Sequence, residues 1–464
     1  IARKMSLKLY NSATSQKEDF KSLSPNQVLM YCCGPTVYDA PHLGNFRTFV
    51  FYDLVKRVLI QNNFEVKQVV NITDIDDKII DKVNSGEMDY KELTTKFNDV
   101  FLQHSKTLNI EKADEYPKTS DHVPAMIDFI KQLIDKGYAY NANGNIFFDT
   151  DGYSQYGKFI NMENTEALDD EDNALGKKNQ KDFTLWKAWK EEDGDITWES
   201  EWGNGRPAWH TECAVLATKS LGNAIDIHCG GIDLKFPHHE NETAQVEALL
   251  DATFSNYWLH SEHLTLEEEK MSKSLGNTVN VSDLLGKYSP ETLRLFLLSS
   301  HYRSKIYFSD KKLDDSSKML DKINRFIEHI GINTLESSNA NISDDYTRFL
   351  DALNDDLNTP EALGIFFDFI NKKNKKIHDN SLSEKDIKES QEFIAGFNFI
   401  FCVFNQSSLK NQEIPSEVQK LASLREKMRN QQKWEEADKL RGEIEKLGWL
   451  IEDLKDSQKL LKKK

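Results

Sequence analysis

An alternation of strand and helix patterns near the start of the chain constrains the fold more than any other feature of the sequence. Residues 28–33 form a short apolar run that ends at a Gly-Pro pair, which predicts a buried strand followed by a turn. Apolar residues then recur at helical spacing over 44–62, and 66–72 shows a second strand pattern. A strand, a glycine-containing loop, a helix and a strand make a βαβ unit, so we expect a parallel sheet.

The remaining chain divides into regions of different pattern. Its 464 residues allow roughly two to four domains. Residues 121–209 are less regular, and strand patterns return at 146–148 and 224–228. From about residue 311 onward the pattern is helical. Two apolar stripes near the C-terminus predict a helical hairpin that packs on itself, one with Val418, Leu421, Leu424 and Met428 and one with Ala437, Leu440, Ile444 and Leu447.

Charge and cysteine content narrow the class of protein. The net charge of −17 argues against general binding of nucleic acid through a basic surface, although residues 411–464 alone carry a small positive charge. Six acids within 163–172 predict a solvated loop. Five sparse cysteines suit a reducing cytoplasm and a catalytic or metal-binding role. The sequence contains neither an apolar run long enough for a membrane span nor a secretory signal, so we expect a cytoplasmic protein with no membrane partner.

Two short segments have the composition of phosphate-binding loops. His42-Leu43-Gly44-Asn45 precedes the first helix, where unpaired N–H groups and the helix dipole favour an anion. Taken alone, the segment is better explained as a helix-capping loop. Lys270-Met271-Ser272-Lys273-Ser274 can clamp a transferring phosphate. A solvated charge run is an equally good explanation, because three glutamates precede it.

Other nucleotide-binding and protease motifs are rejected. Residues 152–158 read G-x-x-x-x-G-K, but Phe159 stands where a P-loop needs a Ser or Thr hydroxyl for magnesium. We interpret this segment as a loop around Tyr153 and Tyr156. The sequence also lacks H-E-x-x-H, so a zincin protease has no support.

Four residues distant in the sequence have the donor types of a zinc site. His238 and Glu242 share one face if that region is helical, and Cys33 and Cys213 supply two thiols. Two thiolates, an imidazole and a carboxylate would make a tetrahedral zinc site. The chain has no C-x-x-C, and spacing alone favours packed cysteines and a surface His/Glu pair.

In combination, the two phosphate-loop motifs resemble those of the class I aminoacyl-tRNA synthetases. Further sequence segments resemble those of the cysteinyl-tRNA synthetases. The similarity runs from about residue 7 into the C-terminal hairpin. The segments on which this similarity rests are Cys33–Asp39, Asn71–Lys78, Trp209–Cys213, Gly230–Glu242 and Asp356–Pro360.

The resemblance implies a zinc ion held by Cys33, Cys213, His238 and Glu242, with Cys32 and Cys229 as packing residues and His239 outside the ligand set. Zinc prefers thiolate, which would distinguish cysteine from serine where an apolar pocket discriminates poorly. The resemblance further implies that Thr73, Trp209 and His228 line the amino-acid pocket.

The implied reaction has two steps and needs no protein nucleophile. The carboxylate of L-cysteine attacks the α-phosphate of ATP, and a ribose hydroxyl of the terminal adenosine of tRNA(Cys) then takes the acyl group. His42, Asn45, Lys270 and Lys273 would stabilise the phosphate charge together with Mg²⁺. The expected ATP-binding residues are His42, Gly44, Asn45, Asp233, Lys270 and Lys273. The family usually has His at position 45, and we expect activity to survive with Asn.

The implied fold is α/β, with a Rossmann-type parallel sheet and added helical domains, in a protein expected to be a monomer. We expect the catalytic core at 5–120 and 210–255, an inserted connective domain at 121–209, a signature-loop domain at 256–315, a helical bundle at 316–410 and a small helical anticodon-binding region at 411–464.

Two competing functions remain. A cysteine ligase acting on a sugar amine is disfavoured, because the chain continues for about 150 residues of helical pattern beyond the lysine loop. An inactive tRNA-binding paralogue is disfavoured because both lysines and all four metal-ligand candidates are present.

Overall fold

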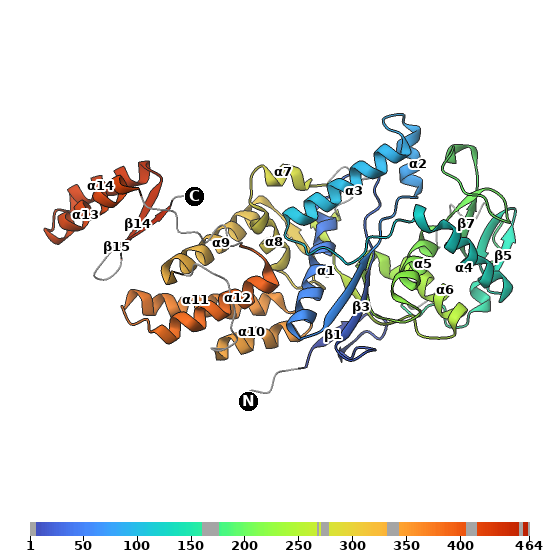
Figure 1. Ribbon diagram of the computed structural model, residues 1–464, viewed down its shortest axis with the longest axis horizontal. Coiled ribbons are helices and arrows are strands. Elements are labelled where there is room, and N and C mark those ends of the chain that lie inside the picture. The colour runs from blue at the N-terminus through green and yellow to red at the C-terminus, as the bar shows by residue number, and fades with distance from the viewer. Residues whose placement is uncertain are drawn as a thin grey trace. The chain divides into compact units, whose positions relative to one another are not determined.

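The computed structural model forms two compact units. One unit comprises residues 1–310 and 352–359, and the other comprises 311–351 and 360–464 (Figure 1). The described residues are 6–159, 176–266, 269–270, 278–331, 343–404, 415–453 and 458–462. The acidic segment 163–172 and Lys273 lie outside them.

A four-stranded parallel sheet forms the centre of the first unit, which confirms the βαβ prediction. Its strand order is β10-β9-β3-β4, and each neighbouring pair is parallel. The strands are β3 (Gln27–Cys32), β4 (Glu65–Val70), β9 (Ile225–Gly231) and β10 (Ser255–Ser261). Helix α1 (Leu43–Gln61) connects β3 to β4. Because helices cover such a sheet, its strands are largely buried, and β9 is buried along its whole length.

The region between β4 and β9 adds helices and a second sheet. Helices α2 (Asp77–Asn84) and α3 (Tyr90–Thr107) follow β4. An antiparallel sheet has the order β5-β6-β7-β8, with β5 (Ala139–Ala142), β6 (Asn145–Phe148), β7 (Phe183–Ala188) and β8 (Gly205–Pro207). Short 3-10 turns lie at Ser120–His122, Thr150–Gly152 and Glu191–Asp193.

Three helices of this unit join the two sheets through one hydrophobic core. They are α4 (Val123–Asp135), α5 (Trp209–Leu221) and α6 (Glu240–Leu250). The core runs from Trp186 of β7 through Ala214 of α5 to Trp258 of β10, all three without exposed surface. The inserted sheet is therefore packed firmly against the helices that follow it.

The rest of the first unit consists of short elements. They are the hairpin of β1 (Lys8–Asn11) and β2 (Gln16–Asp19), the turns Ile232–Leu234 and Lys235–His239, strands β11 (Leu264–Leu266), β12 (Glu269–Lys270) and β13 (Ile306–Phe308), and helices α7 (Val281–Leu285) and α8 (Pro290–Leu298). Strands β12, β11 and β13 form a small sheet in that order.

The helical pattern beyond residue 311 is confirmed over four long helices. They are α9 (Asp310–Ile330), α10 (Asp344–Asn354), α11 (Thr359–His378) and α12 (Glu384–Phe401). Stacked phenylalanines hold them together, for example Phe366 and Phe397 with ring centroids 3.8 Å apart. No helix among the described residues combines the length and apolar character that crossing a bilayer requires.

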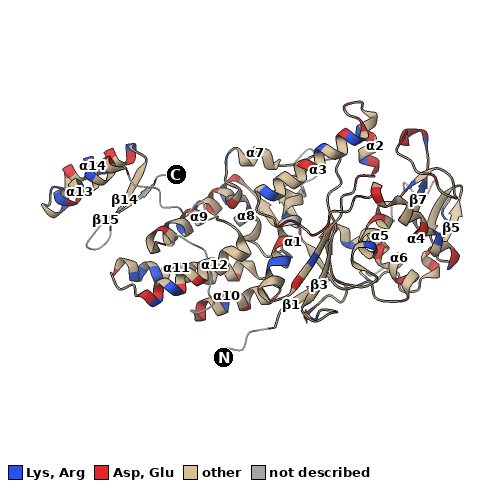
Figure 2. Cartoon of the chain, in the orientation of Figure 1, with Lys and Arg blue, Asp and Glu red and all other residues tan. Residues whose placement is uncertain are grey.

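The C-terminal part contains the two predicted helices and a β-hairpin that the helical pattern does not predict. Helices α13 (Ser416–Asn430) and α14 (Trp434–Lys446) precede antiparallel strands β14 (Trp449–Asp453) and β15 (Gln458–Lys462). Trp449 and Ile451 of β14 complete the core with Val418 and Ile444, whereas Leu424 of the predicted stripe is exposed. Basic and acidic side chains are mixed along both helices (Figure 2).

Candidate active site

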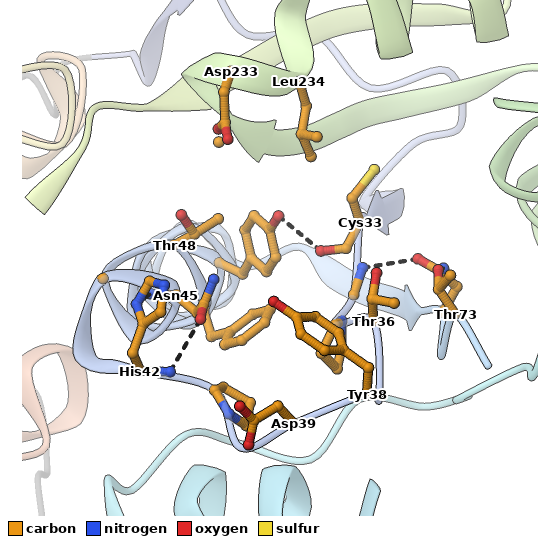
Figure 3. A pocket seen from close by; sticks show the side chains of 18 of the residues that line it. Cys33, Thr36, Tyr38, Asp39, His42, Asn45, Thr48, Thr73, Asp233 and Leu234 are labelled. Atoms are coloured by element: carbon orange, nitrogen blue, oxygen red, sulfur yellow. Dashed lines mark hydrogen bonds between the residues drawn. The ribbon is translucent and has the colours of Figure 1, made fainter. Parts of the chain in front are cut away.

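A cavity of about 320 Å³ opens at the carboxyl ends of the parallel strands. Cys33 follows β3, Thr73 follows β4 and Gly231 ends β9, and all three line the cavity. Ligands of open α/β sheets bind at this edge, because the loops that leave the strands meet there. Figure 3 shows side chains from these loops directed around the same space.

A close approach of two loops shapes the floor of the cavity. The N–H of Gly34 donates to Oδ1 of Asn71 at 2.8 Å, and Nδ2 of Asn71 donates to Oγ1 of Thr73 at 3.0 Å. A Cβ on Gly34 would lie 1.7 Å from the carbonyl oxygen of Asn71. Only glycine therefore fits here, which explains the Gly-Pro turn after the first strand.

The loop before α1 both caps the helix and lines the cavity. The backbone N–H of His42 donates to Oδ1 of Asn45 at 3.0 Å, and the backbone N–H of Asn45 donates to Nδ1 of His42 at 3.2 Å (Figure 3). This reciprocal pattern is a capping box. His42, Gly44 and Asn45 line the cavity with Asp233. Helix capping and phosphate binding are therefore compatible roles, because the loop that caps α1 also lines the cavity.

The backbone on either side of the second lysine motif is placed near this loop. Lys270 pairs with Thr265 in the β11–β12 ladder, and the neighbouring Leu264 lines the cavity. On the far side of the motif, the N–H of Leu43 donates to the carbonyl of Val279 at 3.0 Å. The side chain of Lys270 is not described, and Lys273 lies outside the described residues.

The four residues predicted as zinc ligands come together in a buried cluster. One ligand atom from each of Cys33, Cys213, His238 and Glu242 lies within 4.8 Å of every other. Cys213 is on α5, His238 is in the turn before α6, and Glu242 is in the first turn of α6. Two sulfurs, an imidazole nitrogen and a carboxylate oxygen match the donors that zinc prefers.

A second group with the same spacing overlaps this cluster. It consists of Cys33, His228, His239 and Glu242. Nε2 of His228 lies 2.9 Å from Oε2 of Glu242, and Nδ1 of His239 lies 2.8 Å from Nε2 of His260. Since this set offers one sulfur rather than two, the first set suits a thiophilic ion better.

The charges in the cluster favour a cation. A hydrogen bond from Cys33 lowers the pKa of the Cys213 thiol to about 6, whereas burial raises the pKa of Cys33 well above its ordinary value. Burial acts to raise the pKa of Glu242, but His228 and His238 outweigh it and hold that pKa at about 2. Burial acts to lower the pKa of His238, and Glu242 with Cys213 raises it to about 10. The lowered pKa values of Cys213 and Glu242 favour two anionic donors, and a bound metal would replace the remaining protons.

The residues predicted for the amino-acid pocket divide into two groups. Thr73 and Trp209 line the cavity, and the Trp209 ring stacks on His238 with centroids 4.1 Å apart. His228 is fully buried against Glu242 and is not among the residues that line the cavity.

Several lining residues were not predicted, namely Thr36, Tyr38, Asp39, Lys78 and His263. Thr36, Tyr38 and Asp39 belong to the loop that leaves β3, and Lys78 lies in the first turn of α2 after the loop that leaves β4; this position is the signal that could have found them.

Family models match three successive parts of the chain. The model of the class I (C) tRNA synthetase catalytic domain matches residues 19–318, a DALR domain matches 348–405, and the cysteinyl-tRNA ligase anticodon-binding domain matches 411–459. The cysteine–tRNA ligase of Thermococcus gammatolerans is 39% identical over 470 residues, covering 97% of this chain and 98% of the relative. The chain belongs to the cysteine–tRNA ligases. The cysteine–tRNA ligase of Pyrococcus horikoshii is 40% identical over 467 residues, covering 97% of this chain and 98% of the relative.

Membership of the cysteine–tRNA ligases makes this chain a ligase that joins cysteine to tRNA. Solved structures of low identity share the fold. A methionyl-tRNA synthetase of Mycobacterium tuberculosis has a TM-score of 0.57 and 14% identity, covering 81% of this chain and 89% of that one. A LeuRS of Agrobacterium radiobacter K84 has a TM-score of 0.61 and 10% identity, with 85% and 87% covered. The expected class I α/β fold is confirmed.

Proposed function

We propose that this ligase selects L-cysteine with a zinc ion held by Cys33, Cys213, His238 and Glu242. The observation that carries the proposal is the position of Cys33 and Cys213, which belong to the ligand cluster and also line the cavity. A small substrate in the cavity can therefore reach the cluster. Zinc would supply a preference for thiolate and a lowered thiol pKa, and serine offers neither.

The chain's own residues would orient cysteine beside the metal site. The Thr73 hydroxyl is held by Asn71 at the edge of the cavity, and the Trp209 ring covers His238. His228 bonds to Glu242, so we assign it to the orientation of that carboxylate. Trp209 has 40% of its surface exposed and is available to shield a bound side chain from water.

ATP with Mg²⁺ would occupy the other side of the cavity. We propose that His42, Gly44 and Asn45 bind phosphate at the N-terminus of α1 and that Asp233 binds the ribose. Lys270 and Lys273 would approach the same phosphates, because the backbone flanking them is joined to β11 and to Leu43. Catalysis then depends on position and electrostatic stabilisation rather than on a protein nucleophile.

The second substrate would be tRNA(Cys). Solved structures with this fold include a complex with methionyl-adenylate and a complex with tRNA. The match to an anticodon-binding model supports assigning 411–464 to the anticodon. We retain 5–120 with 210–255 as the catalytic core, 121–209 as the insertion, 256–315 as the signature-loop domain and 316–410 as the bundle.

We also propose a monomeric, cytoplasmic protein. No disulfide joins any of the five cysteines, all of which the structure describes, and this suits a reducing compartment. Light scattering of the purified chain tests the oligomeric state.

Two assays test the proposed function. Cysteine-dependent exchange of pyrophosphate into ATP reports adenylate formation, and acylation of tRNA reports transfer. We expect both with the purified chain and stoichiometric zinc. Absence of exchange would support the inactive paralogue, and exchange without charging of any tRNA would support the sugar-amine ligase.

A further inference from the structure

Lys78 places an ammonium group at the wall of the cavity. It is the one Lys or Arg among the described residues that line the cavity, whereas Asp39 and Asp233 contribute carboxylates. A cavity that must accept phosphates therefore has few fixed cations outside the lysine motif. The position of this ammonium therefore indicates where one phosphate group of a substrate binds in the cavity.

Two aspartates fix the start of α2, where Lys78 lies. Asp76 caps α2 and accepts a hydrogen bond from the N–H of Lys78 at 2.8 Å. Asp77 pairs with Arg206 of β8 and, at 2.7 Å, with Lys187 of β7. Burial acts to raise the pKa of Asp77, but these two cations outweigh it and hold that pKa at about 2. The start of α2 is thus anchored to the inserted sheet by ionised groups.

The Lys78 side chain itself lies over an aromatic ring. Its Nζ is 5.4 Å from the centroid of Tyr38, which also lines the cavity. This ammonium forms no ion pair within 4.0 Å among the described residues. Burial raises the pKa of Asp76 at the cap of α2, and the charge of Lys78 acts to lower the pKa of that carboxyl. A ring face beside an available cation is the combination that binds a single nucleotide, because the base stacks on the ring and the phosphate pairs with the cation.

The position of this pair relative to the other subsites indicates which nucleotide it takes. Cys33 and Cys213 mark the cysteine end, and Asp233 with the α1 N-terminus marks the ATP side. Tyr38 and Asp39 lie away from Asp233 and on the same side as His42 (Figure 3), so the pair borders the phosphate end of the proposed ATP site and not its ribose end. Transfer requires a third group in the same cavity, the terminal nucleotide of tRNA.

We propose that Tyr38 and Lys78 form the site for the 3′-terminal nucleotide of tRNA, with the base on the Tyr38 ring and its 5′-phosphate at the Lys78 ammonium. This inference rests on the proposed function. It assigns Lys78 to the transfer step rather than to adenylate formation.

The test compares the two half-reactions in one variant and a matched control. Lys78→Met removes the charge and keeps most of the side-chain length. Lys82→Met is the control, because Lys82 lies one turn further along α2, faces Glu87 at 3.9 Å and does not line the cavity. Pyrophosphate exchange measures the first step, and single-turnover transfer from preformed cysteinyl-adenylate to tRNA measures the second.

We expect Lys78→Met to slow transfer at least about tenfold more than exchange, whereas Lys82→Met slows neither. Tyr38→Phe keeps the ring and should transfer faster than Tyr38→Leu. An equal loss in both half-reactions would assign Lys78 to ATP and overturn the proposal, as would unchanged transfer. A wild-type chain without cysteine-dependent exchange would instead refute the proposed function, so the two failures are distinguishable.

Discussion

The backbone N–H of Leu43 donates a 3.0 Å hydrogen bond to the carbonyl oxygen of Val279. This bond joins the loop that caps α1 to the segment that follows the lysine motif, and His42 forms a β-bridge with Asn280 beside it. The two motifs that carry the family resemblance are far apart in the sequence, and the backbone that follows the second is hydrogen-bonded to the loop of the first. This bond supports the proposal that both motifs act on one substrate.

Replacement of Asn45 separates helix capping from phosphate binding. Asn45→Asp keeps an oxygen for the N–H of His42 and adds a negative charge near the N-terminus of α1. Acidic side chains stabilise a helix there, so the free energy of unfolding should be unchanged or higher. The same charge repels ATP, and pyrophosphate exchange should fall at least about tenfold.

Asn45→His is the companion variant, since the family usually has His at this position. We expect equal or higher exchange activity, measured under the same ATP and cysteine concentrations. A large loss of activity would contradict the role assigned to this side chain.

Cys213→Ser tests the ligand set directly. The hydroxyl is a much poorer zinc ligand than a thiolate, so bound zinc should fall well below one per chain and the preference for cysteine over serine should decline with it. Metal content is measured by elemental analysis and selectivity by exchange with each amino acid. Cys229→Ser is the control, because Cys229 is equally buried and belongs to neither ligand group. Stoichiometric zinc in Cys213→Ser would refute the assignment.

A buried ion network between α1 and α8 should control stability in a pH-dependent way. Asp53 accepts from Arg57 at 2.8 Å and from Arg294, and both Asp53 and Arg294 are buried. Burial acts to raise the pKa of Asp53, but the two arginines outweigh it and leave that pKa below its ordinary value. Asp53→Asn leaves Arg294 without its charge partner and should cost about 3 kcal/mol at pH 7.

The sign of the pH dependence follows from the lowered pKa of Asp53. A depressed folded-state pKa gives stability that is present above the unfolded pKa of about 3.9 and is lost as the pH falls below it. The difference in unfolding free energy between wild type and Asp53→Asn should thus be constant from about pH 7 to 5 and shrink below about pH 4. Denaturant titrations at each pH check this. A difference in unfolding free energy that grows as the pH falls would contradict the role assigned to this ion network.

Glu240 should hold the loop that the sequence presents as an incomplete P-loop. Its buried carboxylate accepts from the N–H groups of Gly157, Lys158 and Phe159 at 2.9, 3.1 and 2.8 Å. Glu240→Gln replaces one acceptor with a donor, so these amides should exchange hydrogen faster while those of β9 do not. Lys158→Met is the control, because it removes the side-chain bond to Glu247 and keeps the backbone bond. Unchanged exchange in Glu240→Gln would show that the carboxylate does not hold the loop.

Much of the fold was predictable because its periodicities are local. The β3–α1–β4 unit follows from apolar runs and helical spacing. Helix α14 ends just before Gly448, which has a φ of +82° and is of the residue type that commonly ends a helix. The β14–β15 hairpin was not predicted, because its short strands carry charged residues and resemble a continued helix. Trp449 and Ile451 reach the core only once the hairpin forms.

The site was predictable only through the resemblance. Spacing alone favoured packed cysteines at 33 and 213, because their proximity depends on β3 and α5 meeting across the sheet. The placement of His228 behind Glu242 and of Lys78 in the cavity likewise depends on tertiary packing. No sequence periodicity encodes such contacts between distant segments.

The most direct test of the central claim is acylation of a complete tRNA pool by the purified, zinc-loaded chain, with cysteine and serine compared side by side. We predict that one tRNA acceptor species is charged and that cysteine is preferred over serine by more than the about 200-fold that an apolar pocket can give. Failure to charge any tRNA with cysteine, or comparable charging with serine, would contradict the account.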